Sequence, residues 1–112
     1  MNARRLAIII LTLITAFIHL YLASVAFSQG DMQTTIMFSL NGLGYLALLA
    51  AYTLPIGFLQ GRRSLVRWAF IALTAVTVLG WVVIGARTPL AYLDKLAELA
   101  LLALLITDKG SM

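Results

Sequence analysis

Four long apolar segments, separated by short polar stretches, dominate the sequence. They cover residues 6–27, 35–54, 66–85 and 90–106, and each has 17 to 22 residues. A helix rises about 1.5 Å per residue, so segments of this length match the roughly 30 Å hydrocarbon core of a bilayer. The pattern predicts an all-α fold, an integral membrane four-helix antiparallel bundle.

Composition favours the same class. Of the 112 residues, 62% are hydrophobic and 11% are charged, whereas about 25% are charged in an average soluble domain. A soluble fold of about 110 residues buries about two-thirds of its surface, so the apolar excess must face something other than water. We therefore expect residues 1–112 to form a single transmembrane domain whose partner is the lipid bilayer. The chain has no cysteine, which excludes disulfides and thiolate metal sites.

Polar and helix-breaking residues mark the ends of the segments. The polar turn 28–31 ends the first, and Pro55 with Gly57 kinks or ends the second. Arg87 closes the third. Thr88 has the residue type of an N-cap, and Pro89 occupies a first-turn position that tolerates proline.

The basic residues near the segment ends predict the orientation. With the N-terminus inside, only Arg87 lies outside, and six basic residues lie on the inner side: Arg4, Arg5, Arg62, Arg63, Arg67 and Lys109. Under the positive-inside rule this asymmetry predicts a multi-pass protein of the cell membrane with both termini cytoplasmic. The same arginines account for most of the net charge of +4, so we expect no nucleic-acid partner.

The first segment has a second interpretation as a secretory signal. Arg4 and Arg5, the apolar stretch and the small residues 24–26 permit cleavage after Ala26. The apolar run is, however, longer than the usual h-region and continues through His19 and Tyr21. We favour a first membrane span and keep cleavage as the alternative.

The few polar residues within the segments lie at one depth. Counted at about 1.5 Å per residue from the outer segment ends, His19, Asn41, Asp94, Lys95 and Glu98 lie between about 8 and 14 Å deep, in the outer half of the bilayer. On the fourth helix the three charged residues share one face. Tyr45, one turn below Asn41, is a further hydrogen-bond candidate. We predict a polar intramembrane cluster of these six residues.

Small side chains predict the packing faces. On the first helix one stripe centres on His19 and includes Thr12, Thr15, Ala16, Ala23 and Ala26. Small residues let helix backbones approach closely in lipid, so this stripe is expected to face inward. On the third helix Ala69, Ala72 and Gly80 form a second small stripe, interrupted by Val76, which we also expect to face inward.

The cluster allows a structural and a functional interpretation. Lys95 can neutralise Asp94 and Glu98 while His19 and Asn41 hydrogen-bond between helices, which would merely fix the helix register. Alternatively, the residues form a polar pocket open to the outer face that holds a proton, ion, cofactor or lipid headgroup. A metal site at His19, Asp94 and Glu98, or a haem at His19, is weakly supported because the chain has one histidine. We expect no cofactor.

Short motifs in all four segments resemble a family of small four-span prokaryotic membrane proteins of unknown function. The motifs are IHLYL at 18–22, NGLGY at 41–45, the stretch from Thr77 to Trp81, and Asp94-Lys95 followed by Glu98. The layout is more distantly similar to four-span proteins related to quinol-oxidase subunits. It also resembles the small multidrug-resistance transporters, but those carry their coupling glutamate in the first span, where this chain has His19.

No catalytic constellation is complete in the sequence. We therefore expect a non-enzymatic small membrane protein, either a subunit of a membrane complex with other membrane subunits or a self-associating homo-oligomer. The alternative from another class is a proton-coupled small transporter or channel that uses His19, Asp94 and Glu98. A metal- or haem-binding redox membrane protein is the second alternative.

The predicted topology can be tested with reporter fusions. Fusions after Gly61 and after Met112 should both report a cytoplasmic location, because both points lie on the side with six basic residues. An external reporter after Met112 would contradict the topology. A mature chain that begins at Phe27 would show that the first segment is a cleaved signal.

Overall fold

The chain forms four α-helices in a computed structural model, which describes residues 3–54, 61–85 and 87–108. The helices are α1 (Ala3–Ser28), α2 (Met32–Thr53), α3 (Arg63–Ile84) and α4 (Pro89–Thr107). No strand occurs among the described residues. The predicted all-α fold of four helices is confirmed, and each helix matches one apolar segment to within three residues at either end.

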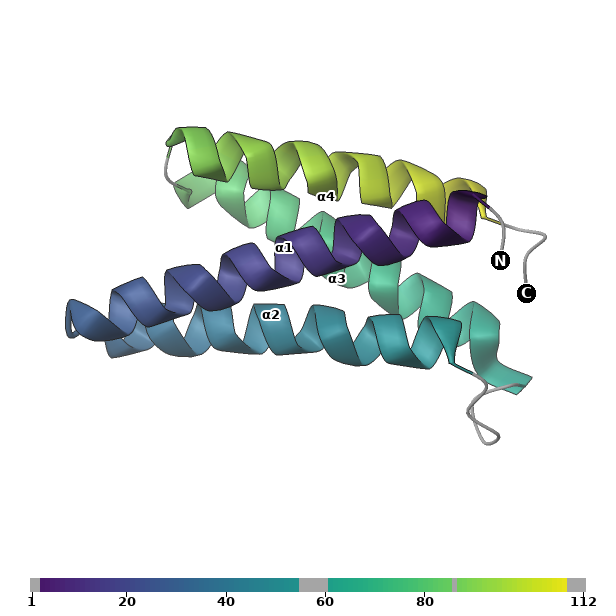
Figure 1. The fold of residues 1–112 in the computed structure, drawn as a ribbon, viewed down its shortest axis with the longest axis horizontal. Coiled ribbons are helices and arrows are strands. Elements are labelled where there is room, and N and C mark those ends of the chain that lie inside the picture. Colours follow the sequence, from purple (N-terminus) through teal and green to yellow (C-terminus); the bar gives the residue numbers. More distant parts are fainter. Residues whose placement is uncertain (1–2, 55–60, 86, 109–112) are drawn as a thin grey trace.

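The helices form an antiparallel bundle. Each packs against its neighbour in the sequence, and α4 also packs against α1, so that the four close into a ring. Figure 1 shows both chain termini at one end of the bundle and the α1–α2 turn at the other. We call these the terminal end and the turn end. The long dimension of the bundle is 43 Å, which matches a bilayer of about 40–45 Å with its headgroup regions.

Local signals define the helix starts at the turn end. The Thr88 side chain accepts a hydrogen bond from the Ala91 backbone N–H, and Pro89 begins α4, as the sequence predicts. Gly30 joins α1 to α2 with a φ of 76°, a conformation that favours glycine. Asp31 caps α2. Hydrogen bonds from the Thr34 side chain and backbone N–H hold the pKa of the Asp31 carboxyl below its ordinary value, so this cap is lost only as the pH falls through the lowered pKa.

The inward face of α1 is the one that its small residues predict. Its buried residues are Ile8, Thr12, Thr15, Ala16, His19, Ala23 and Ala26. Gly42 of α2 lies directly against this face, because a Cβ atom added there would lie 2.8 Å from Leu20 Cγ and 3.1 Å from the Ala16 carbonyl oxygen. The backbones of α1 and α2 therefore approach closely at mid-length.

The expectation that the small residues of α3 face inward is wrong. Ala69, Ala72 and Gly80 are exposed, and the buried residues of this helix are Val66, Arg67, Phe70, Ile71 and Thr74. The Phe70 ring fills the space toward α2, with its centroid 6.3 Å from that of Tyr45 and 5.9 Å from that of Tyr52. Aromatic packing, and not close backbone approach, joins α3 to α2. The small residues consequently lie on the outer surface.

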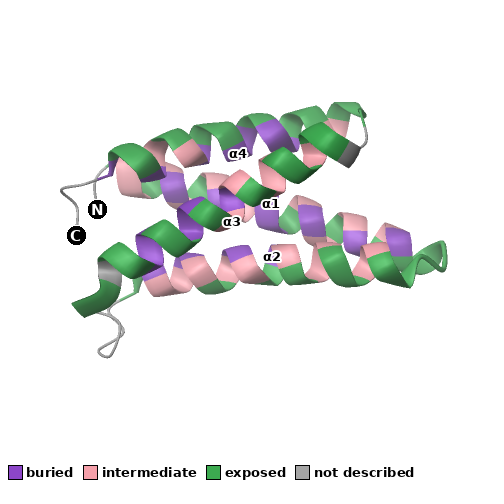
Figure 2. Cartoon of the chain, turned by 180° about the vertical axis from the view of Figure 1, so that it is seen from behind, coloured by how far each residue is buried: buried purple, intermediate pink, exposed green. Residues whose placement is uncertain are grey.

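Large apolar side chains cover the outer faces of the helices. Exposed examples come from every helix and include Phe17, Leu40, Leu79 and Leu96. Figure 2 shows the buried positions along the inward faces, with exposed positions on the outside. Three helices are long and apolar enough to cross a membrane: Ala3–Ser28, Met32–Thr53 and Ser64–Val83. The fourth, α4, has 19 residues and carries Asp94, Lys95 and Glu98.

Gly42 and Gly44 provide a matched test of the α1–α2 contact. Gly42→Ala should destabilise the protein by about 1–3 kcal/mol, the usual cost of overpacking, because the new methyl group would overlap Leu20 and Ala16. Gly44→Ala should be neutral or stabilising, since its Cβ would lie 3.5 Å from Leu73 Cδ2, an ordinary contact. Thermal unfolding in detergent measures both. Equal melting temperatures for the two variants would contradict the close approach.

Candidate functional site

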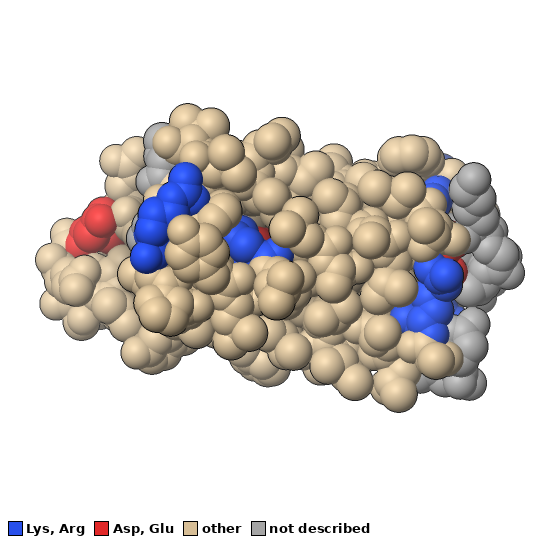
Figure 3. All heavy atoms as spheres, turned by 90° about the horizontal axis from the view of Figure 1, so that it is seen from above, with Lys and Arg blue, Asp and Glu red and all other residues tan. Residues whose placement is uncertain are grey.

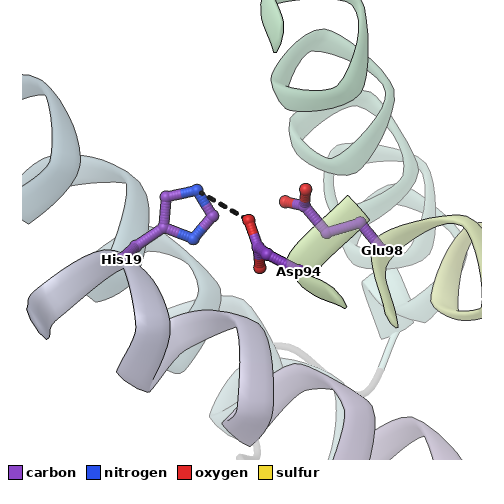
Figure 4. A group of neighbouring side chains, drawn as sticks. All are labelled: His19, Asp94 and Glu98. Carbon is purple, nitrogen blue, oxygen red and sulfur yellow. Dashed lines mark ion pairs between the residues drawn. The ribbon is translucent and has the colours of Figure 1, made fainter. Parts of the chain in front are cut away.

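The polar residues of α1 and α4 meet inside the bundle. His19 Nε2 lies 3.6 Å from Asp94 Oδ2, an ion-pair distance when the ring is protonated. Figure 4 shows the His19 ring directed from α1 toward Asp94 and Glu98 on α4. The Thr15 hydroxyl, one turn from His19, donates to Asp94 Oδ1. Two consecutive turns of α1 therefore contact a single carboxylate of α4.

Lys95 and Tyr45 complete the cluster. Lys95 Nζ lies 3.2 Å from Asp94 Oδ2 and also donates to Glu98 Oε1. The Tyr45 hydroxyl of α2 donates to Glu98 Oε2 at 2.5 Å. Side chains from three helices are thus linked through the two carboxylates of α4. The ammonium group is the shared centre of the arrangement.

Asn41 lies apart from these contacts, although the sequence analysis groups it with them. Its Nδ2 donates to the Thr77 hydroxyl of α3 at 2.8 Å. Thr77 in turn donates to the Leu73 carbonyl oxygen, so its oxygen can only accept from Asn41, which fixes the orientation of the amide. Asn41 Oδ1 is then buried without a hydrogen-bond partner. Asn41 and Thr77 form a polar link between α2 and α3 beside the cluster, because Thr77 also lies near the Tyr45 hydroxyl.

The cluster is removed from solvent. Glu98 is fully buried, and 2% of the surface of His19 and of Asp94 is exposed. Lys95 is also buried. Charged groups at such positions are rare unless they are paired and hydrogen-bonded, because removing them from water costs several kcal/mol per ion. Each charge here has a partner, which explains how the bundle tolerates it.

The hydrogen bonds of His19 define where its protons must be. Nδ1 lies 2.7 Å from the Thr15 carbonyl oxygen, which can only accept, so Nδ1 carries a proton. Nε2 faces the Asp94 carboxylate. Two acceptors would oppose each other there unless a proton lies on Nε2 or on Asp94. The geometry therefore fits a cluster that holds one additional proton between His19 and Asp94.

A charge count leads to the same requirement. Asp94 and Glu98 contribute two negative charges and Lys95 contributes one positive charge, so the cluster carries a net charge of −1 when the histidine is neutral. One bound proton makes it neutral. A neutral arrangement is strongly preferred in a low-dielectric interior.

The cluster also has donor atoms that suit a metal ion. One ligand atom from each of His19, Asp94 and Glu98 can be chosen so that all lie within 4.8 Å of one another. Lys95, however, contacts both carboxylates, so a metal ion would have to displace the ammonium group. Binding of a haem iron by His19 would likewise replace the contact of a ring nitrogen with Thr15 or with Asp94. The cluster can bind a proton without losing any of these contacts, whereas a metal ion would have to displace Lys95.

A second polar layer at the terminal end is missing from the sequence analysis. Arg67 is buried and donates to the Leu105 and Ile106 carbonyl oxygens, while Arg4 donates to Leu104. Arg5 lies at the last carbonyl groups of α2, and Tyr52 donates to the buried Asp108. These arginines donate to carbonyl groups in the last turns of α2 and α4, where backbone partners within a helix run out. The sequence contains a signal for this layer, because each of the three arginines lies at the level of a predicted helix end.

Two surface hollows of the bundle are apolar. One lies on α3 and is lined by Val76, Leu79, Gly80 and Val83. Another lies between α1 and α4 and is lined by Leu11, Ile14, Leu93, Leu96, Ala97 and Ala100. Neither includes a member of the polar cluster. Figure 3 shows one face that is mostly uncharged, with basic side chains mostly toward its two ends and an acidic group at one end.

Comparisons of the chain with protein-family models, with curated proteins and with solved structures give no match. The site must therefore be interpreted from its own geometry.

Substitution of Lys95 tests the internal pairing of the cluster. Lys95→Met should destabilise the protein by about 3–5 kcal/mol, because two buried carboxylates lose their shared cation. The triple change of Asp94, Lys95 and Glu98 to Leu should be less harmful, since it leaves no unpaired charge. Thermal unfolding in detergent gives the order of stabilities. If Lys95→Met melts within about a degree or two of wild type, an inward-facing ion cluster is excluded.

Proposed function

We propose that the chain is a four-span protein of the cell membrane, with both termini cytoplasmic, that takes up and releases protons at the polar cluster. The support for membrane insertion is physical. Three helices have the length and hydropathy of membrane spans, and large apolar side chains are exposed on all four. In water an apolar surface of this extent requires a partner. Lipid covers every outer face at once.

The charged residues of α4 do not prevent it from spanning. A charged side chain at mid-helix costs about 2.5–3.5 kcal/mol on insertion scales when it faces lipid. Asp94, Lys95 and Glu98 are all buried against one another and against α1 and α2. The remaining surface of α4 is apolar, with Leu93, Leu96 and Leu99 exposed. The helix can therefore cross the membrane within the assembled bundle.

Proton exchange is the chemistry that the cluster supports best. The observation that carries this proposal is the pair of contacts at His19, where one nitrogen donates to a carbonyl oxygen and the other faces a carboxylate. One proton shared by His19 and Asp94, whose Nε2 and Oδ2 atoms lie 3.6 Å apart, neutralises the charge of the cluster. Glu98 joins the cluster through hydrogen bonds that it accepts from Tyr45 and Lys95.

The titratable groups that face the site come from three helices. They are His19 on α1, Tyr45 on α2, and Asp94, Lys95 and Glu98 on α4. The described part of α3 contributes Thr74 and Thr77 near the Tyr45 hydroxyl. This arrangement favours a proton-coupled transporter or channel. The described contacts give no specific support for the expected role as a subunit of a complex.

Reconstitution in liposomes with an internal pH-sensitive dye tests the proposal. An imposed pH gradient should decay faster with the wild-type protein than in empty liposomes. His19→Gln should return the decay to the rate of empty liposomes, because glutamine cannot exchange a proton at the Asp94 contact. Proton flux through wild type that is unchanged in His19→Gln would reject the cluster as the pathway.

Tyr21→Phe provides the matched control for this experiment. Tyr21 lies on the same helix, two residues from His19, and is exposed on the outer face. The variant should retain wild-type flux. Absence of flux in wild type and in both variants would favour the subunit interpretation instead.

A further inference from the structure

Burial within the bundle stops abruptly at the level of the polar cluster. Toward the turn end, the last buried residues are Gly42 on α2 and Thr74 on α3, and burial on α4 starts only at Asp94. Among the described residues nearer the turn end on these three helices, none is buried. Only α1 continues to be buried, at Ala23 and Ala26, where it packs against α2.

Residues that continue the inward faces beyond this level are only partly covered. Phe38 follows the buried face of α2 and contacts the His19 ring, with 5.7 Å between the ring centroids, yet it remains part-exposed. Thr77 and Trp81 follow the buried face of α3 and are also part-exposed. Figure 1 shows that the α1–α2 hairpin and the α3–α4 hairpin diverge toward the same end of the bundle.

The terminal end is closed by contrast. Between the cluster and this end lie fully buried Tyr45, Phe70, Leu101 and Leu105, with Tyr52 beside them. Beyond these apolar and aromatic side chains, Arg4 and Arg67 bind the last carbonyl groups of α4. No comparable arginine layer joins separate helices among the described residues of the turn end, where Arg87 donates only to carbonyl groups of its own α3.

We propose that the polar cluster, which is buried in this structure, exchanges protons with water from the turn end, between the two hairpins, and is sealed from the terminal end. Asn41 and Thr77 place polar groups along this route, and the buried Asn41 Oδ1, which has no hydrogen-bond partner, is an acceptor that a water molecule on the route would fill. In the proposed orientation, the cluster exchanges its proton with the side of the membrane opposite the cytoplasm. This inference rests on the proposed function, and it adds the side of access.

Single-cysteine labelling tests the opening directly, because the chain has no cysteine of its own. Thr77→Cys and Phe38→Cys should react with a membrane-impermeant methanethiosulfonate in sealed vesicles from one side only. That side should be the one on which Gln29→Cys, in the α1–α2 turn, reacts. Two inward positions are used because either change alone could disturb the local packing.

Two further cysteine variants serve as controls. Val76 is adjacent to Thr77 and is 67% exposed, but it lies on the outer surface of α3. In lipid its thiol stays protonated, so Val76→Cys should react at least about tenfold more slowly than Thr77→Cys. Leu101→Cys, on the sealed side of the cluster, should not react from either side.

Each outcome decides between the proposals. Failure of both Thr77→Cys and Phe38→Cys to react, or their reaction from the side opposite Gln29→Cys, would overturn the opening at the turn end. If His19→Gln still abolished proton flux, the proposed function would survive that result. Equal reaction at Val76→Cys and Thr77→Cys would instead show that α3 is not surrounded by lipid, which would reject both the membrane placement and the opening.

Discussion

The pairing of charges on α4 is the interaction on which the bundle depends. Asp94, Lys95 and Glu98 lie on one face of a single helix, and without partners they would bar that helix from an apolar environment. Lys95 compensates part of this charge within α4, but Asp94 and Glu98 also require Thr15, His19 and Tyr45. The position of α4 against α1 and α2 is therefore determined by hydrogen bonds and charge, whereas the contact between α1 and α2 depends on small residues. Polar packing of α4 and close packing of small residues between α1 and α2 thus occur at the same level of the bundle, near His19.

Much of this arrangement could be predicted from the sequence. Helix number and approximate ends follow from segment length, and the inward face of α1 follows from the small residues around His19. The proximity of His19, Tyr45, Asp94, Lys95 and Glu98 follows from equal depth on neighbouring helices. These features are encoded in spacing along single helices, which a sequence displays directly.

Other features depend on contacts that no single helix reveals. Asn41 was expected beside His19, but neighbouring residues on a helix point about 100° apart, and because Gly42 faces α1, Asn41 faces Thr77 on α3. The small residues of α3 lie outside because Phe70 sets the spacing to α2. Arg67 was assigned to topology alone, whereas its side chain binds α4. In each case the partner helix decides which of several plausible faces is used.

The dependence of α4 on other helices has a consequence for biosynthesis. α4 follows the other three helices in the chain and therefore leaves the ribosome after them, and alone it would present three charged side chains to the lipid of the proposed membrane. Its partners Thr15, His19 and Tyr45 all belong to the first half of the chain. In the proposed membrane placement, the first hairpin must therefore remain close to the site of insertion until α4 arrives. Under that proposal, integration is a cooperative event that involves all four helices, and not a sequence of independent insertions.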